Sequence, residues 1–424
     1  MSPTLSSLTH PTPPHPTPPC PSLAPQVKRA VAKYSRPVSF PAEFVALTQA
    51  LKAGLDAFAA SAKDSAAEVQ YWDASNSARE AYREATVAVF SGESVDVSAA
   101  DLVQLLTAME AKMDAGIAKA LATNGGLSPS YFYYEVTDYS INSPGPPTLN
   151  GDGSSTAAAT TVSVKAFKTH TLPLFLEGPV RHLKVITSVA EKRRVYESVR
   201  HSNLYDEALR MYMLSESLAA MGQDVGRMKA FSPGWLENQS VWLHMSYKFY
   251  LELLRGGLFE EFWAEVATGL VPFMDPKIYG RSPLEAASFI VSSAFPDPKL
   301  HGASFLARLS GSTAEFLSMW ALMFAGPQPF VVDATSGALQ LKLTPALPGW
   351  LFTEDGLASF TFLGSVTVTY HNPSKVNTWS AVLARAEVTG KDGKVVAVAG
   401  PVIEGQLAES VRSGGVSAVD IFFE

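Results

Sequence analysis

The spacing of apolar residues changes once along this chain, near residue 326, and this change restricts the fold more than any other feature. Before it, apolar residues such as Phe44, Leu47 and Leu51 recur every three or four positions, which is the period of a helix packed on one face. After it, segments alternate or are rich in Val, Thr and aromatic residues, as strands are. The sequence therefore predicts a mainly α protein with a β-rich C-terminal domain.

The helical pattern predicts eight helices, joined by mostly short connections that contain Pro or Gly. They are expected at 41–58, 75–89, 98–122, 202–221, 239–255, 258–271, 282–293 and 312–325. Ser98 is the expected N-cap of the third helix, and Asn124-Gly125-Gly126 is its stop signal. Residues 143–161 are rich in Gly, Pro and Ser and are expected to form a polar inserted loop.

The later pattern predicts six strands and one tight hairpin turn at Lys391-Asp392-Gly393. The strands are expected at 338–343, 358–362, 365–370, 380–389, 394–398 and 418–423. Nine of the first 25 residues are proline, so residues 1–35 are expected to be a disordered or polyproline II tail. The predicted domains are thus this tail, a helical domain at 36–326 and a β-rich domain at 327–424.

Composition excludes several classes of function. With 33 basic and 40 acidic residues the net charge is −7, so no strongly basic surface for nucleic acid is expected. The longest apolar stretch, Phe316 to Gly326, is far shorter than the ~18 residues that span a bilayer. Cys20 is the only cysteine, which excludes intramolecular disulfides and cysteine-based metal sites. A secretory signal is not expected, because the tail lacks both a basic N-terminal region and a continuous apolar segment. We expect a cytoplasmic protein, with an organelle left open, and no metal centre.

A first candidate segment is Tyr71-Trp72-Asp73. A carboxylate beside two aromatic rings can be desolvated, which raises its pKa and favours the protonated acid. Sugar rings also stack on such aromatic side chains. Asp73 is therefore a candidate general acid, and Trp72 and Tyr71 are candidate sugar contacts. The alternative is that Asp73 is the N-cap of a helix starting near Ser75.

A second candidate segment runs from Pro233 to His244 and contains Trp235, Glu237 and Asn238. His244 is expected inside a helix among aromatic residues. It is either a functional side chain or a core histidine bonded to a backbone carbonyl. Glu237 is either functional or a charge in the first turn, where the helix dipole favours it.

A third candidate segment, 308–316, is a Gly-containing turn that opens a helix. Backbone N–H groups at a helix N-terminus form an anion site, and the hydroxyl of Ser310 adds to it beside Gly311. Arg308, just upstream, favours a phosphate. The alternative is ordinary helix capping.

Together these motifs resemble the inverting disaccharide phosphorylases of the cellobiose and chitobiose phosphorylase type. The family's Glu-Asn motif and the histidine seven residues later match Glu237-Asn238 and His244. Its phosphate-binding Leu-Thr-Gly-Thr-Ala motif resembles Leu309-Ser310-Gly311-Ser312-Thr313-Ala314, with Ser310 replacing the threonine. A Pro-x-x-Pro-x-x-Trp segment is loosely similar to Pro345 to Trp350. The resemblance covers roughly Tyr71 to Phe423.

This resemblance implies a six-hairpin glycosidase-like (α/α)6 toroid followed by a small β-sandwich-like domain. It implies phosphorolysis of a β-linked glucan or disaccharide to an α-sugar 1-phosphate, with inorganic phosphate as co-substrate and no other cofactor. Asp73 would be the acid, His244, Ser310, Gly311 and Arg308 would bind phosphate, and Trp72, Tyr71, Glu237, Asn238 and Trp235 would contact the sugar.

The chain also departs from this family. The family's Asp-Trp-Asn-Asp stretch is not present, and Tyr71-Trp72-Asp73 is its nearest substitute. Eight expected helices form only part of a toroid of six hairpins, so we expect the C-terminal part of a larger protein. Homodimerisation is implied by the family, whose interface uses the region missing here.

Two other functions remain open. A truncated, non-catalytic remnant or sugar-binding module is consistent with the incomplete toroid. An inverting glycoside hydrolase of the same barrel would need a second carboxylate opposite Asp73, for which Glu237 and Glu315 are the candidates.

Overall fold

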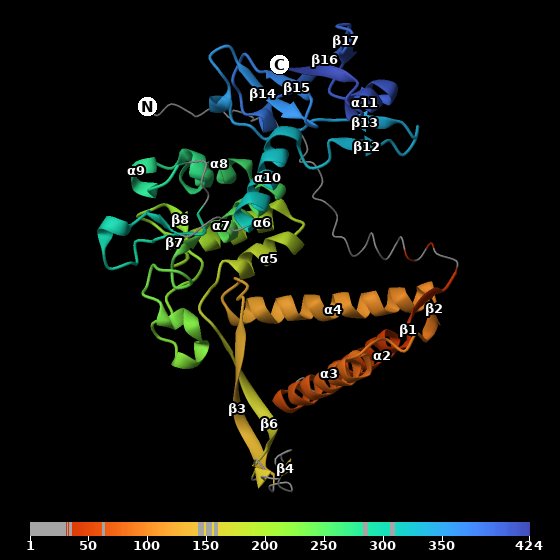
Figure 1. Cartoon of the computed structure of the whole chain (residues 1–424), viewed down its shortest axis with the longest axis vertical. Coiled ribbons are helices and arrows are strands. Elements are labelled where there is room, and N and C mark those ends of the chain that lie inside the picture. The colour runs from red at the N-terminus through yellow and green to blue at the C-terminus, as the bar shows by residue number, and fades with distance from the viewer. Residues whose placement is uncertain are drawn as a thin grey trace, which may run out of the picture. The chain divides into compact units, whose positions relative to one another are not determined.

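The computed structural model describes residues 31, 33, 36–61, 64–142, 148–149, 155–156, 160–282, 287–305 and 310–424. The described residues form two compact units, a first unit that ends at Leu174 and a second unit from Phe175 to Glu424. Both contain helices and strands, so the described chain is of mixed α and β class (Figure 1). The predicted tail, with His10, His15 and Cys20, lies largely outside the described residues.

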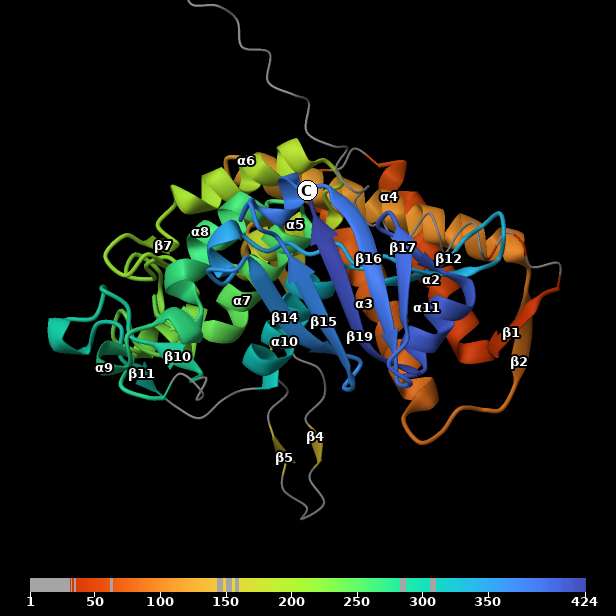
Figure 2. The ribbon, with the colours of Figure 1, turned by 90° about the horizontal axis from the view of Figure 1, so that it is seen from above.

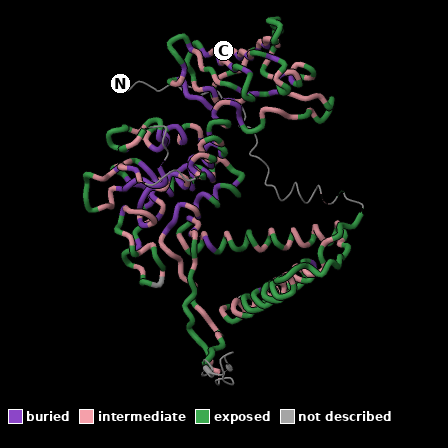
Figure 3. The backbone as a smooth tube through the Cα atoms, viewed as in Figure 1, coloured by how far each residue is buried: buried purple, intermediate pink, exposed green. Residues whose placement is uncertain are grey.

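The described part of the first unit contains three helices and three antiparallel strand pairs. The helices are α2 (Ala42–Ala59), α3 (Ser65–Thr86) and α4 (Ala99–Thr123). The pairs are β1 (Val38–Pro41) with β2 (Ser94–Val97), β3 (Phe132–Ile141) with β6 (Val162–Thr171), and β4 (Thr148–Leu149) with β5 (Ser155–Thr156). Few described side chains of this unit are buried, as the green and pink tube of its helices and of β3 and β6 shows (Figure 3).

The second unit begins with helices around α7 (Leu243–Arg255), whose side chains are buried on nearly every side. α5, α8 and α10 each pack on α7. The other elements of this part are α5 (Glu177–Val185), α6 (Val189–Arg200), β7 (Tyr205–Asp206), β8 (Met211–Tyr212), β9 (Val241–Trp242), α8 (Phe259–Gly269), α9 (Pro276–Tyr279), β10 (Phe289–Ile290), β11 (Ser304–Phe305) and α10 (Ser310–Ala325).

The C-terminal part of the second unit is a five-stranded sheet of order β14-β15-β19-β16-β17 (Figure 2). Its strands are β14 (Leu357–Phe362), β15 (Val366–His371), β16 (Leu383–Gly390), β17 (Val395–Ala399) and β19 (Val416–Phe423). Only β15 and β19 run parallel, and the chain between them includes β16, β17 and, directly before β19, α11 (Gly405–Arg412). A smaller sheet joins β12 (Phe330–Val332), β13 (Leu339–Leu341) and β18 (Ile403–Glu404).

The C-terminal part of the second unit is hydrogen-bonded to the helices that precede it. The indole of Trp263 on α8 donates to the carbonyl of Ala346 at 2.8 Å, and the Tyr370 hydroxyl on β15 donates to the carbonyl of Phe324 on α10. The two compact units meet in the sequence at Leu174–Phe175, inside the helical domain predicted at 36–326. The predicted domain boundary at residue 326 stays a prediction.

The structure confirms most predicted elements and corrects others. The strands and the turn at 391–393 are confirmed, as are helices within 41–58, 98–122, 239–255, 258–271 and 312–325. The helix predicted at 202–221 is wrong, because this segment holds the β7–β8 hairpin and turns. The described part of 282–293 contains β10 and no helix. The sequence pattern missed α5, α6, β3 and β6.

Candidate functional site

His244 is held at the start of α7 by a short three-stranded sheet. β9 directly precedes the helix and pairs with β10, and the N–H of Leu243 donates to the carbonyl of Ser288 at 3.2 Å. The ring of Trp242 meets the imidazole of His244 edge to face, with centroids 5.5 Å apart. The imidazole is half-buried, and the sheet fixes the position at which the chain enters α7.

The first turn of α10 runs directly against His244. A Cβ atom added to Gly311 would lie only 3.1 Å from the Cβ of His244, so the glycine permits this close approach. Ser310 is the first residue of α10 and is exposed. Backbone N–H groups in the first turn of a helix have no partner within the helix and favour an anion. The fold thus brings His244, Ser310 and Gly311 together from two distant motifs.

The electrostatic environment of His244 combines three influences. Burial lowers the pKa of the His244 imidazole, the nearby cation of Lys248 lowers this pKa further, and the carboxylate of Glu177 on α5 raises it. The Nδ1 atom is buried and has no hydrogen-bond partner among the described residues. A buried nitrogen without a partner is costly, so a hydrogen bond between this atom and a ligand or a water molecule would be favourable.

The buried histidines predict a pH-dependent stability. Burial lowers the pKa of both His182 and His244, so the unfolded chain binds more protons below its ordinary histidine pKa of about 6.5. Their contribution to the free energy of unfolding is therefore present above that pH and is lost as the pH falls through it. Urea unfolding at pH 7.5 and 5.5 measures this loss in wild type and in His182→Gln.

The difference between variants is the informative quantity, because the buried carboxyl of Glu265, whose pKa is raised, acts with the opposite sign. His182→Gln is expected to reduce the loss of stability on acidification. His201→Gln is the matched control, since the His201 side chain is 75% exposed, and it should keep the wild-type slope. An unchanged slope in His182→Gln would contradict the prediction.

The predicted sugar contacts Glu237, Asn238 and Trp235 form a compact turn before β9. Glu237 forms an ion pair with Arg227, and the buried Asn238 donates from Nδ2 to the carbonyl of Phe231 at 2.8 Å. Glu237 lies outside any helix, so the first-turn interpretation of its charge is wrong. Trp235 is half-buried and its ring packs against three phenylalanines, Phe289, Phe295 and Phe305. Their roles in sugar binding remain predictions.

Asp73, Trp72 and Tyr71 lie on α3 in the first unit, whereas His244 lies in the second. α3 begins at Ser65 and is capped by Asp64, which accepts from the N–H of Ala67 at 2.9 Å, so the interpretation of Asp73 as an N-cap is wrong. Asp73 is exposed, and Trp72 is 57% exposed, so the desolvation expected beside two aromatic rings is not observed. The Tyr71 ring instead packs on Phe58, with centroids 5.1 Å apart.

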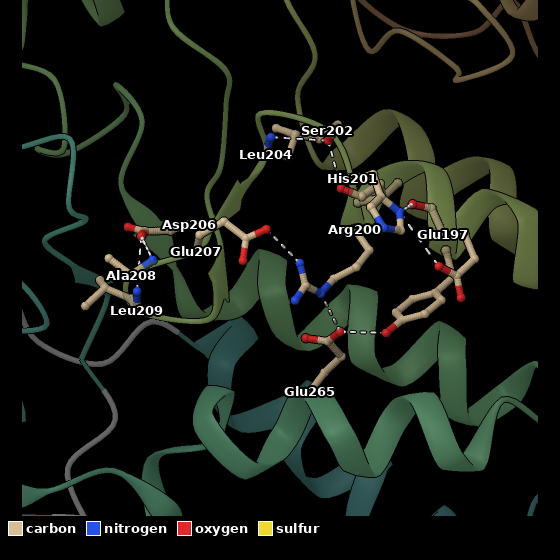
Figure 4. Close-up of polar contacts among 12 residues, drawn as sticks. Glu197, Arg200, His201, Ser202, Leu204, Asp206, Glu207, Ala208, Leu209 and Glu265 are labelled. Atoms are coloured by element: carbon tan, nitrogen blue, oxygen red, sulfur yellow. Dashed lines mark hydrogen bonds and ion pairs between the residues drawn. The ribbon is translucent and has the colours of Figure 1, made fainter.

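Another polar cluster of the second unit links α6 to α8 (Figure 4). Glu265 is 4% exposed, accepts from the Tyr196 hydroxyl at 2.7 Å, and lies 3.6 Å from Nε of Arg200. Burial raises the pKa of the Glu265 carboxyl, and the hydrogen bond and the cation offset part of this rise. We interpret this cluster as a structural link between the two helices.

Arg308 lies outside the described residues. Sequence reasoning missed Glu177 and Lys248. Lys248 could have been found, since it follows His244 by four positions and such residues share a helix face. Nothing local in the sequence points to Glu177.

Two general searches of the described residues gave negative findings. No cluster of three or more His, Cys, Asp or Glu side chains suited to a metal ion occurs among them. Their helices include none with both the length and the apolar character required to cross a lipid bilayer.

Two comparisons of the chain with known proteins gave no match. No protein-family model matches it. No curated protein matches it either.

Proposed function

We propose that this chain is a carbohydrate-active protein whose second unit binds inorganic phosphate between α7 and α10. The observation that supports it best is the approach of Gly311 to His244, because it brings an imidazole next to the N-terminus of a helix, whose N–H groups favour an anion. Ser310 adds a hydroxyl at the same turn. These are the residues that the resemblance to inverting phosphorylases assigns to phosphate.

The proposed reaction is phosphorolysis of a β-glucoside. Phosphate attacks the anomeric carbon from the face opposite the glycosidic bond, while Asp73 donates its proton to the leaving oxygen. The products are an α-sugar 1-phosphate and a shortened sugar. No second carboxylate is needed, because phosphate itself is the nucleophile. The fold proposed with it is a partial (α/α)6 toroid followed by a β-sandwich-like domain.

Replacing His244 with alanine tests this proposal. The variant is expected to bind inorganic phosphate about 10- to 100-fold more weakly, since one hydrogen bond to a charged ligand is lost. Calorimetric titration with phosphate measures the affinity, and His201→Ala is the exposed control. Release of glucose 1-phosphate from cellobiose and longer β-glucans should require phosphate. Sugar release that ignores phosphate would instead indicate a hydrolase.

Binding without turnover is the second candidate. The exposed position of Asp73 on α3 favours it, because an exposed carboxyl lacks the environment that keeps an acid protonated. In this case wild type and Asp73→Asn would bind phosphate or glucan equally and neither would release product. A hydrolase receives less support from Glu237, which is already paired with Arg227, and Glu315 on α10 stays its other candidate base.

A further inference from the structure

Ser310 and Gly311 bring no full positive charge to the proposed phosphate site, and Arg308, which was also predicted to bind phosphate, lies outside the described residues. Burial and the cation of Lys248 lower the pKa of the His244 imidazole below its ordinary value, which favours its neutral form. The N–H groups of the first turn of α10 carry only partial charges. Phosphate at this pH carries between one and two negative charges, and an anion moved out of water needs a cation or several strong donors.

Lys248 is a cation placed to meet this need. It follows His244 by four positions on α7, so the two side chains project from the same face of the helix, with Cβ atoms about 5–6 Å apart. Lys248 is half-buried. It has no ion-pair or hydrogen-bond partner among the described residues, whereas Lys184 on α5 lies 3.8 Å from the carboxylate of Glu252. Its charge already acts on His244.

We propose that Lys248 is the cationic ligand of the anion held by His244 and the first turn of α10. This inference rests on the proposed phosphate site and adds a residue to it. A bound anion would remove the repulsion that Lys248 exerts on a protonated His244. The carboxylate of Glu177, on α5, acts on this imidazole with the opposite sign and raises its pKa.

The test compares lysine variants in calorimetric titrations with inorganic phosphate at pH 7. Lys248→Met is expected to bind phosphate about 10- to 100-fold more weakly than wild type, and Lys248→Arg should stay close to wild type. Lys277→Met is the matched control, because Lys277 is an exposed lysine on α9 of the same unit, and its phosphate affinity should not change. Thermal unfolding without phosphate shows that each variant is folded.

A second readout does not depend on phosphate affinity. Loss of the neighbouring cation in Lys248→Met or Lys248→Gln is expected to raise the pH at which His244 titrates, measured by NMR of the imidazole protons. If Lys248→Met binds phosphate like wild type while His244→Ala does not, Lys248 is not a ligand and the proposed function stands. If wild type binds no phosphate, both are overturned.

Discussion

Asp206→Ala is expected to lower the free energy of unfolding of the second unit by about 3–5 kcal/mol. Asp206 is 3% exposed and accepts four hydrogen bonds. Two come from the N–H groups of Ala208 and Leu209, at 3.0 and 3.1 Å, within its own turn (Figure 4). Two come from the N–H and hydroxyl of Ser293, at 2.7 and 2.8 Å. Alanine would leave all four donors without this acceptor, at positions that are partly buried.

The chain offers a matched control for this prediction. Asp333 accepts from the N–H of Thr335 and from the N–H and hydroxyl of Ser336, at 3.1, 2.7 and 2.8 Å, but its hydrogen bonds are exposed to water. Asp333→Ala should therefore leave the urea midpoint near that of wild type, because water replaces the lost acceptor. Equal urea midpoints for Asp206→Ala and Asp333→Ala would contradict the prediction that the burial of Asp206 makes its loss more costly.

The same carboxylate explains why the helix predicted at 202–221 does not form. Apolar residues such as Leu204, Ala208 and Met211 recur there at spacings of three or four positions, as on a helix face. Asp206 instead closes a turn and pairs with Ser293, far away in the sequence. Local spacing carries no information about such a partner, so tertiary contacts override the pattern.

The C-terminal strands were predictable for a local reason. In β15 and β19 buried and more exposed residues alternate, because one face of the sheet packs inward. The helix α4 was predictable from its ends, since Ser98 accepts from the N–H of Asp101 and Asn124 follows the last turn. The order of the strands was not predictable, as the parallel pairing of β15 with β19 depends on a long connection that includes β16, β17 and α11.

The candidate site was predictable only in pieces. His244 and the Ser310-Gly311 turn each have a local signature, but their contact is set by how α10 packs on α7. Lys248 follows from spacing once His244 is taken as a ligand. Glu177 does not, because its effect on His244 arises from the packing of α5 on α7. Charge around a site is thus a property of the fold more than of any motif.

Gly234→Ala is expected to destabilise the second unit by about 3–5 kcal/mol, for two separate reasons. Gly234 has a φ of +80°, a conformation that costs a side chain about 1–2 kcal/mol. A Cβ atom there would also lie 2.4 Å from the backbone nitrogen of Phe295, which cannot move without its own segment. Gly280→Ala separates the two effects, because Gly280 has a φ of +75° and nothing within 4 Å of the added carbon.

The control should therefore lose only the conformational part, and the difference between the two urea midpoints measures the steric part. Gly234 supports the candidate site, since its N–H donates to the carbonyl of Asn238 at 2.8 Å and closes the turn that leads into β9 and His244. Phosphate affinity of folded Gly234→Ala should accordingly fall, whereas that of Gly280→Ala should not. If the two variants are equally stable, the backbone at Phe295 moves away from the added carbon at no measurable cost. The turn would then not be a rigid support for His244.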